Sequence, residues 1–167
     1  MTQTPLAPAG SLKNFQIQWV FGNTPDPLRQ QMIAFWLHEG AMTNPDEAWR
    51  RSGEVVCVLR DMLDGHIAGV CTVAICLDDH SKSYGFVRLF IRSSSRLVGL
   101  NVRLMERMIE GFEGMAREPG APRRLVITIE NRKIERRAAQ KILAKLGFVH
   151  AGTAANGEFV MQLGLGT

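Results

Sequence analysis

The order in which two hydrophobic periods alternate along this chain is the feature that most constrains its fold. A period of two is typical of half-buried strands, whereas apolar residues every three or four positions are typical of helices that bury one face. From the N-terminus onward, these segments follow the order β-α-α-β-β-β-α-β-α-β-β. We therefore expect an α/β (α+β) protein with a mixed, mostly antiparallel central sheet of about seven strands, flanked by four helices.

The same patterns give approximate bounds for each element. Strands are expected at 15–21, 54–60, 67–77, 84–92, 125–129, 148–152 and 158–163. A short helix is predicted between Asn44 and Gly53, because Asn44, Pro45 and Glu47 form an N-terminal capping signature. The last long helix is predicted to end at Gly147, since glycine commonly closes a helix.

Length and composition indicate one domain. The chain has 167 residues, of which 46% are apolar and 22% charged, a balance typical of a globular protein with a core. Residues 1–14 contain two prolines and a glycine without periodicity, so we expect a flexible tail there and one domain over 15–167. No apolar run reaches the roughly 18 residues of a spanning helix, and no secretory signal is visible. These features favour a cytoplasmic protein that has no membrane as a partner.

The charged residues and cysteines exclude several classes of site. Cys57, Cys71 and Cys76 are odd in number, lack CxxC spacing and have no nearby histidine, which argues against a disulfide framework or a metal site. We expect three buried thiols and no metal. The formal net charge of +4 suits an anionic ligand such as a nucleotide but is also common elsewhere. A basic cluster at 132–145 is interpreted as a solvated helix face, because no aromatic residues alternate with it, so nucleic acid is not favoured as a partner.

The junction between the strand at 84–92 and the next helix carries the chemistry. A serine-rich loop leads through Arg96-Leu-Val-Gly99-Leu-Asn101 directly into that helix. Free N–H groups and the helix dipole make a helix start a natural anion site, and Gly99 has no Cβ to keep a phosphate away. Arg96 can add a charge-assisted hydrogen bond. The pattern is neither a Walker loop nor GxGxxG. A phosphate loop is the functional interpretation, and a simple turn with a helix cap is the alternative.

Arg96-x-x-Gly99-x-Asn101 resembles the Q/R-x-x-G-x-G/A loop of the GCN5-related N-acetyltransferases (the GNAT superfamily), except at its last position. The run Ala144-Lys-Leu-Gly-Phe148 is similar to the Leu-Gly-Phe end of the family's fourth helix, and the element order also matches over roughly residues 15–163. This resemblance implies a GNAT-like acyl-CoA N-acyltransferase fold, with acetyl-CoA as the acyl donor and no metal.

The resemblance also implies roles for individual residues. Arg96 and the backbone amides of the loop would hold the pyrophosphate, through Leu97, Val98, Gly99, Leu100 and Asn101. The pantetheine arm would pair like an extra strand with backbone groups of Phe90, Ile91 and Arg92, and Asn131 would face the same arm. A main-chain N–H beside this strand can polarise the thioester carbonyl.

Two positions depart from the family pattern. Asn101 replaces the usual glycine or alanine, and Leu143 stands where many members have a tyrosine that protonates the departing thiolate. A thiol with a pKa of about 8.5 is a tolerable leaving group without full protonation, so the loss of that tyrosine weakens the prediction of an enzyme without removing it.

An amine acceptor must lose a proton before it attacks, which calls for a base or a water chain. Glu130, at the carboxyl end of the strand at 125–129, is the first candidate; the alternative is an exposed carboxylate paired with the basic residues that follow. His80 is a weaker candidate. His38 is expected to be a partly buried structural residue, and His66 carries no functional signal.

Two functions remain open from the sequence. The first is an acetyl-CoA-dependent N-acetyltransferase that acetylates a primary amine of a small molecule or peptide by direct attack in a ternary complex. Its unidentified acceptor would lie between residues 26–53 and the loop 151–157. The second is a CoA- or acyl-CoA-binding protein of the same fold with little or no activity, which the residues at 101 and 143 motivate. A weaker third is an acetyltransferase directed at RNA. Edge strands at both ends of such a sheet are compatible with a homodimer.

Overall fold

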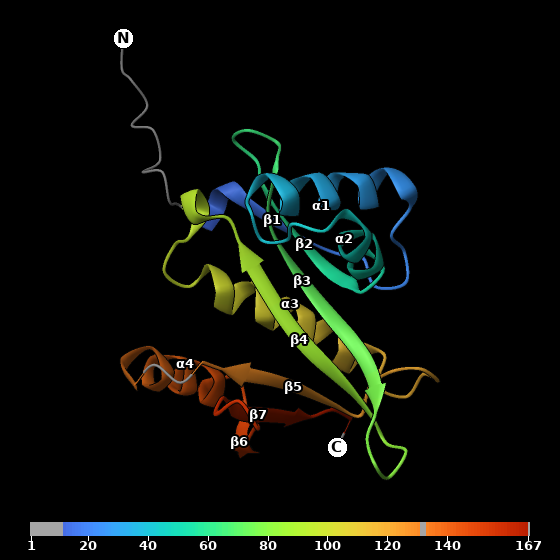
Figure 1. Ribbon diagram of the computed structural model, residues 1–167, viewed down its shortest axis with the longest axis vertical. Coiled ribbons are helices and arrows are strands. Elements are labelled where there is room, and N and C mark those ends of the chain that lie inside the picture. The colour runs from blue at the N-terminus through green and yellow to red at the C-terminus, as the bar shows by residue number, and fades with distance from the viewer. Residues whose placement is uncertain (1–11, 131–132, 167) are drawn as a thin grey trace. The chain divides into compact units, whose positions relative to one another are not determined.

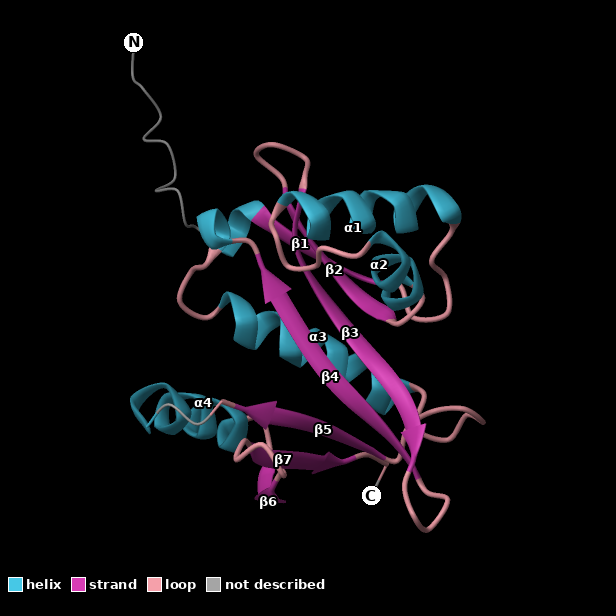
Figure 2. Ribbon diagram, viewed as in Figure 1, coloured by secondary structure: helices cyan, strands magenta, loops and turns pink. Residues whose placement is uncertain are grey.

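A computed structural model of the chain describes residues 12–130 and 133–166. Its strands and α-helices (Figures 1 and 2) are β1 (Phe15–Trp19), α1 (Asp26–His38), α2 (Pro45–Ser52), β2 (Val55–Asp61), β3 (Ile67–Leu77), β4 (Ser83–Ile91), α3 (Leu100–Gly114), β5 (Arg124–Ile129), α4 (Lys133–Lys145), β6 (Val149–Thr153) and β7 (Phe159–Gly164). Two short 3-10 helices, η1 (Leu12–Asn14) and η2 (Ser93–Ser95), complete the described elements. Of the predicted tail, residues 1–11 lie outside the described residues, and 12–14 form η1.

Within the described chain, the strands form one seven-stranded sheet in the order β1-β2-β3-β4-β5-β7-β6. β4 and β5 are parallel, and the pairs β1–β2, β2–β3, β5–β7 and β6–β7 are antiparallel. The predicted element order and the mixed, mostly antiparallel sheet are therefore confirmed. The chain divides into two compact units: the first holds residues up to Thr72 together with Leu89–Met108, and the second holds Val73–Arg88 together with the residues from Ile109 onward.

In the first unit, α1 and α2 cover one face of β2 and the start of β3 (Figure 1). Met32, Phe35 and Trp36 recur at helical spacing on α1 and are buried in this core, where Trp36 is only 2% exposed. The second helix begins as predicted, because Asn44 Oδ1 accepts hydrogen bonds from the N–H groups of Asp46 and Glu47, at 2.9 and 3.3 Å.

Buried side chains from the first half of α3 belong to the same unit, and they include Leu104, Met105 and Met108. Cys57 on β2 lies directly opposite Cys71 on β3 in the strand register, and both are buried. Burial raises the pKa of the Cys57 thiol to about 12, with Arg107 opposing that rise. Burial also raises the pKa of Cys71 well above its ordinary value. The prediction of three buried thiols is wrong for Cys76, which is exposed near the end of β3.

This difference predicts selective alkylation. With iodoacetamide at pH 8, only Cys76 of the native protein should react quickly, because Cys57 and Cys71 are buried and hold their protons. Mass spectrometry should therefore find one label per chain under native conditions and three in guanidinium chloride. Rapid labelling of all three thiols in the native protein would show that Cys57 and Cys71 are accessible to solvent, which contradicts their burial between β2 and β3.

In the second unit, β5, β7 and β6 form an antiparallel group, and the start of β4 pairs with β5. Helix α4 ends at Lys145, and Gly147, the predicted closing residue, follows it with a φ of +100°. The N–H of Gly147 donates to the carbonyl of Ala144, and the N–H of Phe148 donates to that of Leu143, at 3.1 and 2.9 Å. These two bonds form a Schellman motif, which requires the left-handed conformation that glycine adopts freely.

Candidate functional site

The loop between β4 and α3 has the form that the sequence predicts. After Ile91 the chain makes the single turn η2, and α3 begins at Leu100. Gly99 has a φ of +89°, in the left-handed region that favours glycine. The nearest atom to a Cβ built at Gly99 is Leu12 Cδ1, at 3.9 Å, so there is open space above this part of the loop.

Most of the loop's amides have no acceptor within the described chain. The N–H of Leu100 closes a turn by donating to the carbonyl of Leu97, at 3.2 Å. Among the described residues, no group accepts from the N–H of Leu97, Val98, Gly99 or Asn101. The side chain of Asn101 accepts from the N–H of Val102, at 2.9 Å, and so takes one donor of the helix start. The remaining amides, together with the helix dipole, suit an anion.

Arg96 folds back onto the end of β4. Its Nε donates to the carbonyl of Ile91 at 2.9 Å, and its guanidinium lies 5.8 Å from the centre of the Phe90 ring. No described residue accepts a hydrogen bond from its two terminal nitrogens, which keep their donors for a ligand.

Arg92 is held by a network of partners that the sequence did not reveal. Its terminal nitrogen Nη2 contacts Asp61 Oδ2 at 3.0 Å and Asp64 Oδ2 at 2.9 Å, and its Nε donates to Ser95 Oγ at 2.7 Å. Its backbone N–H donates to the carbonyl of Ala68 on β3, at 2.8 Å. These contacts, which we call the Arg92 network, tie the β2–β3 turn to the loop that leads into α3.

The network affects the Asp64 carboxylate and the expected pantetheine contacts. The N–H of His66, assisted by the Arg92 guanidinium, holds the pKa of Asp64 below its usual value. Two backbone groups proposed for the pantetheine arm already have partners, namely the N–H of Arg92 and the carbonyl of Ile91. No sequence signal links Arg92 with carboxylates 28 and 31 positions earlier.

The remaining predicted site residues belong to the second unit. Glu130 is exposed directly after β5, and Asn131 lies outside the described residues. Leu143 is buried, with 6% of its surface exposed. A leucine has no hydroxyl group, so this position supplies no proton donor. The chain's single tyrosine, Tyr84, is half-buried on β4, and its ring lies 5.3 Å from the Arg124 guanidinium. Burial, assisted by Cys76, raises the pKa of this tyrosine.

The basic cluster agrees with a helix face that is mainly solvated. Arg137, Lys141 and Lys145 are exposed on α4, whereas Arg136 is half-buried, with its guanidinium 4.3 Å from the centre of the Phe159 ring. Arg132 lies outside the described residues.

A groove of about 650 Å³ also lies in the first unit. One wall is α1, through residues that include His38 and Glu39; another is the β2–β3 turn, which includes His66. Arg92 and Ser94, which precede the phosphate loop in the chain, also line the groove. We call this the α1 groove. The prediction that His38 is partly buried is wrong, because its side chain is 86% exposed.

Among the described residues there is neither a metal-binding cluster nor a membrane-spanning helix. No three histidine, cysteine or acidic side chains lie close enough together there to bind a metal ion. None of the described helices combines the length and the hydrophobicity that a membrane crossing demands.

No protein-family model and no curated protein matches this sequence, but its fold matches solved structures over most of its length. A GNAT-family acetyltransferase from Streptococcus pneumoniae superposes with a TM-score of 0.64 at 20% identity, over 91% of this chain and 99% of that one. This chain has the GNAT acyl-CoA N-acyltransferase fold. The fold predicted from the sequence is thereby confirmed.

Two further structures share the GNAT fold with this chain. The ribosomal-protein-S5-alanine acetyltransferase from Vibrio fischeri has a TM-score of 0.62 at 16% identity, over 92% of this chain and 94% of that one. A putative acetyltransferase from Salmonella typhimurium, solved with its cofactor acetyl-CoA, has a TM-score of 0.61 at 18% identity, over 92% and 95%. At such low sequence identities the similarity shows the fold alone. The reaction of this chain must be argued from its own residues.

Proposed function

We propose that this chain is an acetyl-CoA-dependent N-acetyltransferase that acetylates a primary amine of a small molecule or peptide. The main support for the proposal is the loop before α3. Gly99 has a φ of +89° there, and the neighbouring backbone amides have no hydrogen-bond acceptor within the described chain. The GNAT fold supports it, and one neighbour with this fold was solved with acetyl-CoA.

The loop would bind the pyrophosphate of acetyl-CoA through main-chain donors. The amides of Leu97, Val98, Gly99 and Asn101 would donate to its oxygens, and the dipole of the 15-residue helix α3 would favour the negative charge. The terminal nitrogens of Arg96 would add charge-assisted bonds. The Arg92 network would hold η2 in place beforehand, because Ser95 is bonded through both its side chain and its backbone.

The transfer would proceed by direct attack of the neutral amine on the thioester carbonyl. The carbonyl carbon of a thioester is electrophilic, and a main-chain N–H beside β4 would stabilise the negative charge that develops on its oxygen. Glu130 is our proposal for the group that takes the proton of the amine, directly or through water. The thiolate would leave without a tyrosine at position 143, since a thiol with a pKa of about 8.5 needs little help.

The buried Leu143 favours one alternative, which is a CoA- or acyl-CoA-binding protein with little or no activity. A positioned acid typically contributes about 10²–10⁴-fold to a rate, so its loss can reduce turnover severely. The two functions separate when calorimetry with acetyl-CoA is combined with chromatographic measurement of CoA release against a panel of primary amines. Binding with amine-dependent release supports the transferase. Binding without release supports the alternative, and the absence of binding overturns both.

A further inference from the structure

We propose that the α1 groove is a second anion site of this chain, in which Arg60 binds the carboxylate of a compact organic acid with an apolar body. The inference goes beyond the proposed function, because neither the phosphate loop nor a transfer step is part of it. The described residues that line the groove all belong to the first unit, and none of them lies in the loop 97–101. A groove of about 650 Å³ has the size of sites for small molecules, which span roughly 300–1,000 Å³.

Arg60, on β2, is the guanidinium group of this groove that lacks a carboxylate partner. Its Nη1 donates to the carbonyl of Gly65 at 3.1 Å and its Nη2 to Gln31 Oε1 at 3.3 Å, and both acceptors are neutral. Within the described chain it forms no ion pair. A guanidinium group has more N–H donors than these two bonds use. Because Arg60 is half-buried, a charge-assisted bond from it to a carboxylate would be only weakly screened by solvent.

Arg92, the second guanidinium group of the lining, already has two carboxylate partners. Asp61 and Asp64 each contact it through Oδ2. Through Oδ1, each of these carboxylates also accepts a backbone N–H of the β2–β3 turn, at 2.9 and 2.8 Å. Neither carboxylate is part of the groove lining, and neither pairs with Arg60. The guanidinium group that remains for a ligand is therefore that of Arg60.

Three other polar side chains of the lining favour a singly charged anion. His38 lies on the α1 wall and His66 on the turn, both are exposed, and an imidazole N–H can donate to a carboxylate. Among the described lining residues, Glu39 alone carries a carboxylate, and His38 Nε2 lies 3.9 Å from it. The charge of Glu39 repels a dianion such as phosphate about twice as strongly as it repels a carboxylate.

The groove also offers apolar surface for the body of the acid. It lies where the C-terminal half of α1 is beside the β2–β3 turn (Figure 1). Phe35 and Ile67 are buried and contribute to the lining, next to the small side chain of Ala34. Phe35 packs edge-on against Phe90 of β4, with 5.7 Å between the ring centres, so its ring is held in place. An aliphatic or aromatic group would gain hydrophobic contact there.

Two probes with the same apolar body test the proposal: cyclohexylacetate, which carries a carboxylate, and 2-cyclohexylethanol, which is neutral. Each is titrated into ¹⁵N-labelled protein without CoA, and the signals are followed by NMR. We expect cyclohexylacetate to shift the amides of Ala34 and His66 and the Nε–H signal of Arg60. It should bind at least about tenfold more tightly than the alcohol, because only the carboxylate accepts a charge-assisted bond.

Variants of Arg60 test the role of its charge. Arg60→Met should weaken cyclohexylacetate binding about tenfold or more and leave the affinity for the alcohol unchanged. Arg60→Lys keeps a positive charge and should retain a preference for the carboxylate. The matched control is Arg103→Met, which removes an exposed guanidinium group from α3 in the same unit, outside the groove. It should leave both affinities unchanged.

A further variant separates this role from a structural one. Arg60 joins the β2–β3 turn to α1 through its two hydrogen bonds. Gln31→Met removes one of these bonds without changing the charge, and it should keep the preference for the carboxylate. A purely structural Arg60 would lower the melting temperature in Arg60→Met and leave the preference for the carboxylate over the alcohol unaltered.

The outcomes separate this inference from the proposed function. Equal binding of the two probes, shifts confined to the amides of residues 97–101, or an unchanged preference in Arg60→Met would overturn the anion site in the groove, even where CoA binds. Failure of CoA to bind would overturn the proposed function, while the titration of the free protein would still decide whether the groove binds a carboxylate.

Discussion

Replacement of Gly99 by valine is expected to weaken CoA binding about a hundredfold or more while the chain still folds. The valine side chain would stand where the pyrophosphate must approach the amides of residues 97–101, so at least two charge-assisted bonds would be lost. Folding should survive, because the nearest atom to the new Cβ is Leu12 Cδ1, at 3.9 Å. Isothermal calorimetry with CoA measures the binding, and urea unfolding measures the stability.

Gly22→Val is the matched control for this variant. Gly22 lies between β1 and α1 in the same unit and also has a positive φ, of +71°. A Cβ built there would meet no atom within 4 Å. Both valines adopt a strained left-handed conformation, which costs roughly 1–2 kcal/mol, so both variants should lose comparable stability. Only the change at position 99 should affect CoA. If both variants bind CoA as the parent protein does, the loop does not hold the pyrophosphate.

The second large effect is on stability: Arg92→Ala should lower the free energy of unfolding by about 3 kcal/mol. The side chains of Arg92 and Asp61 are each only 15% exposed, so removal of the guanidinium leaves a largely buried carboxylate without its partner. Asp64 and Ser95 lose their bonds to the same side chain. Urea unfolding checks the size of the effect, and calorimetry should show weaker CoA binding, because η2 loses its anchor.

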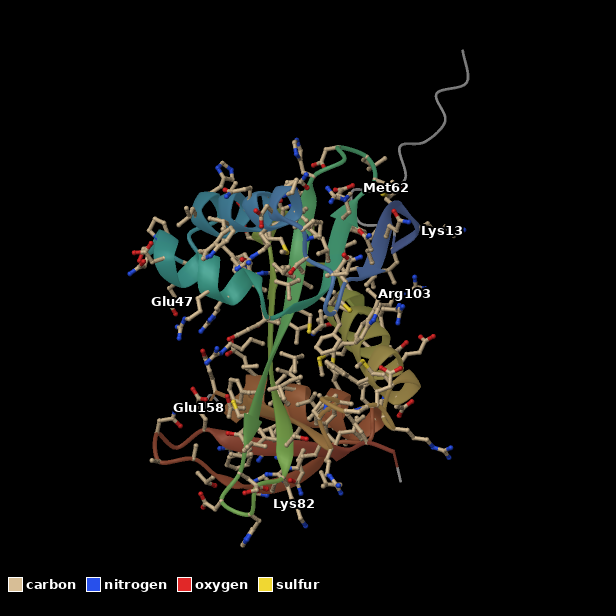
Figure 3. All side chains as sticks on the ribbon, turned by 90° about the vertical axis from the view of Figure 1, so that its right-hand side faces the viewer. Lys13, Glu47, Met62, Lys82, Arg103 and Glu158 are labelled. Atoms are coloured by element: carbon tan, nitrogen blue, oxygen red, sulfur yellow. The ribbon has the colours of Figure 1, made fainter. Side chains whose placement is uncertain are left out.

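Arg103→Ala provides the comparison, since Arg103 is exposed on α3 (Figure 3) and should change stability by no more than about 0.5 kcal/mol. The double variant Arg92→Ala/Asp61→Asn should recover part of the loss, because it removes the unpaired charge as well. A loss below about 1 kcal/mol for Arg92→Ala, without recovery in the double variant, would mean that the network contributes little.

Features that depend on local physics were predictable from the sequence. The long apolar run gave β3 as Ile67–Leu77, and Asn44 and Gly147 marked helix ends because caps depend on neighbouring residues. The first strand is shorter than predicted and ends at Trp19, since the chain turns at Gly22, which has a φ of +71°. The glycine of the loop before α3, Gly99, could also be predicted, because its positive φ depends only on the neighbouring residues of the chain.

Features that join distant segments were not predictable. The Arg92 network joins residues about 30 positions apart, and the α1 groove joins one helix, one turn and the end of a strand. His38 was expected to share the burial of Trp36, but two positions on a helix point to different faces. Cys76 lies in an apolar run, yet the last residues of β3 are exposed. Periodicity alone does not show which residues remain uncovered.

The most direct test is a calorimetric titration of the full chain with CoA and with pantetheine, which lacks the diphosphate. It shows whether the main-chain donors of residues 97–101 bind the diphosphate. We expect one CoA per chain and at least about a hundredfold weaker binding of pantetheine, because the charge-assisted bonds go to the diphosphate. Equal affinities for the two compounds, or no heat with CoA, would contradict a phosphate loop at the start of α3.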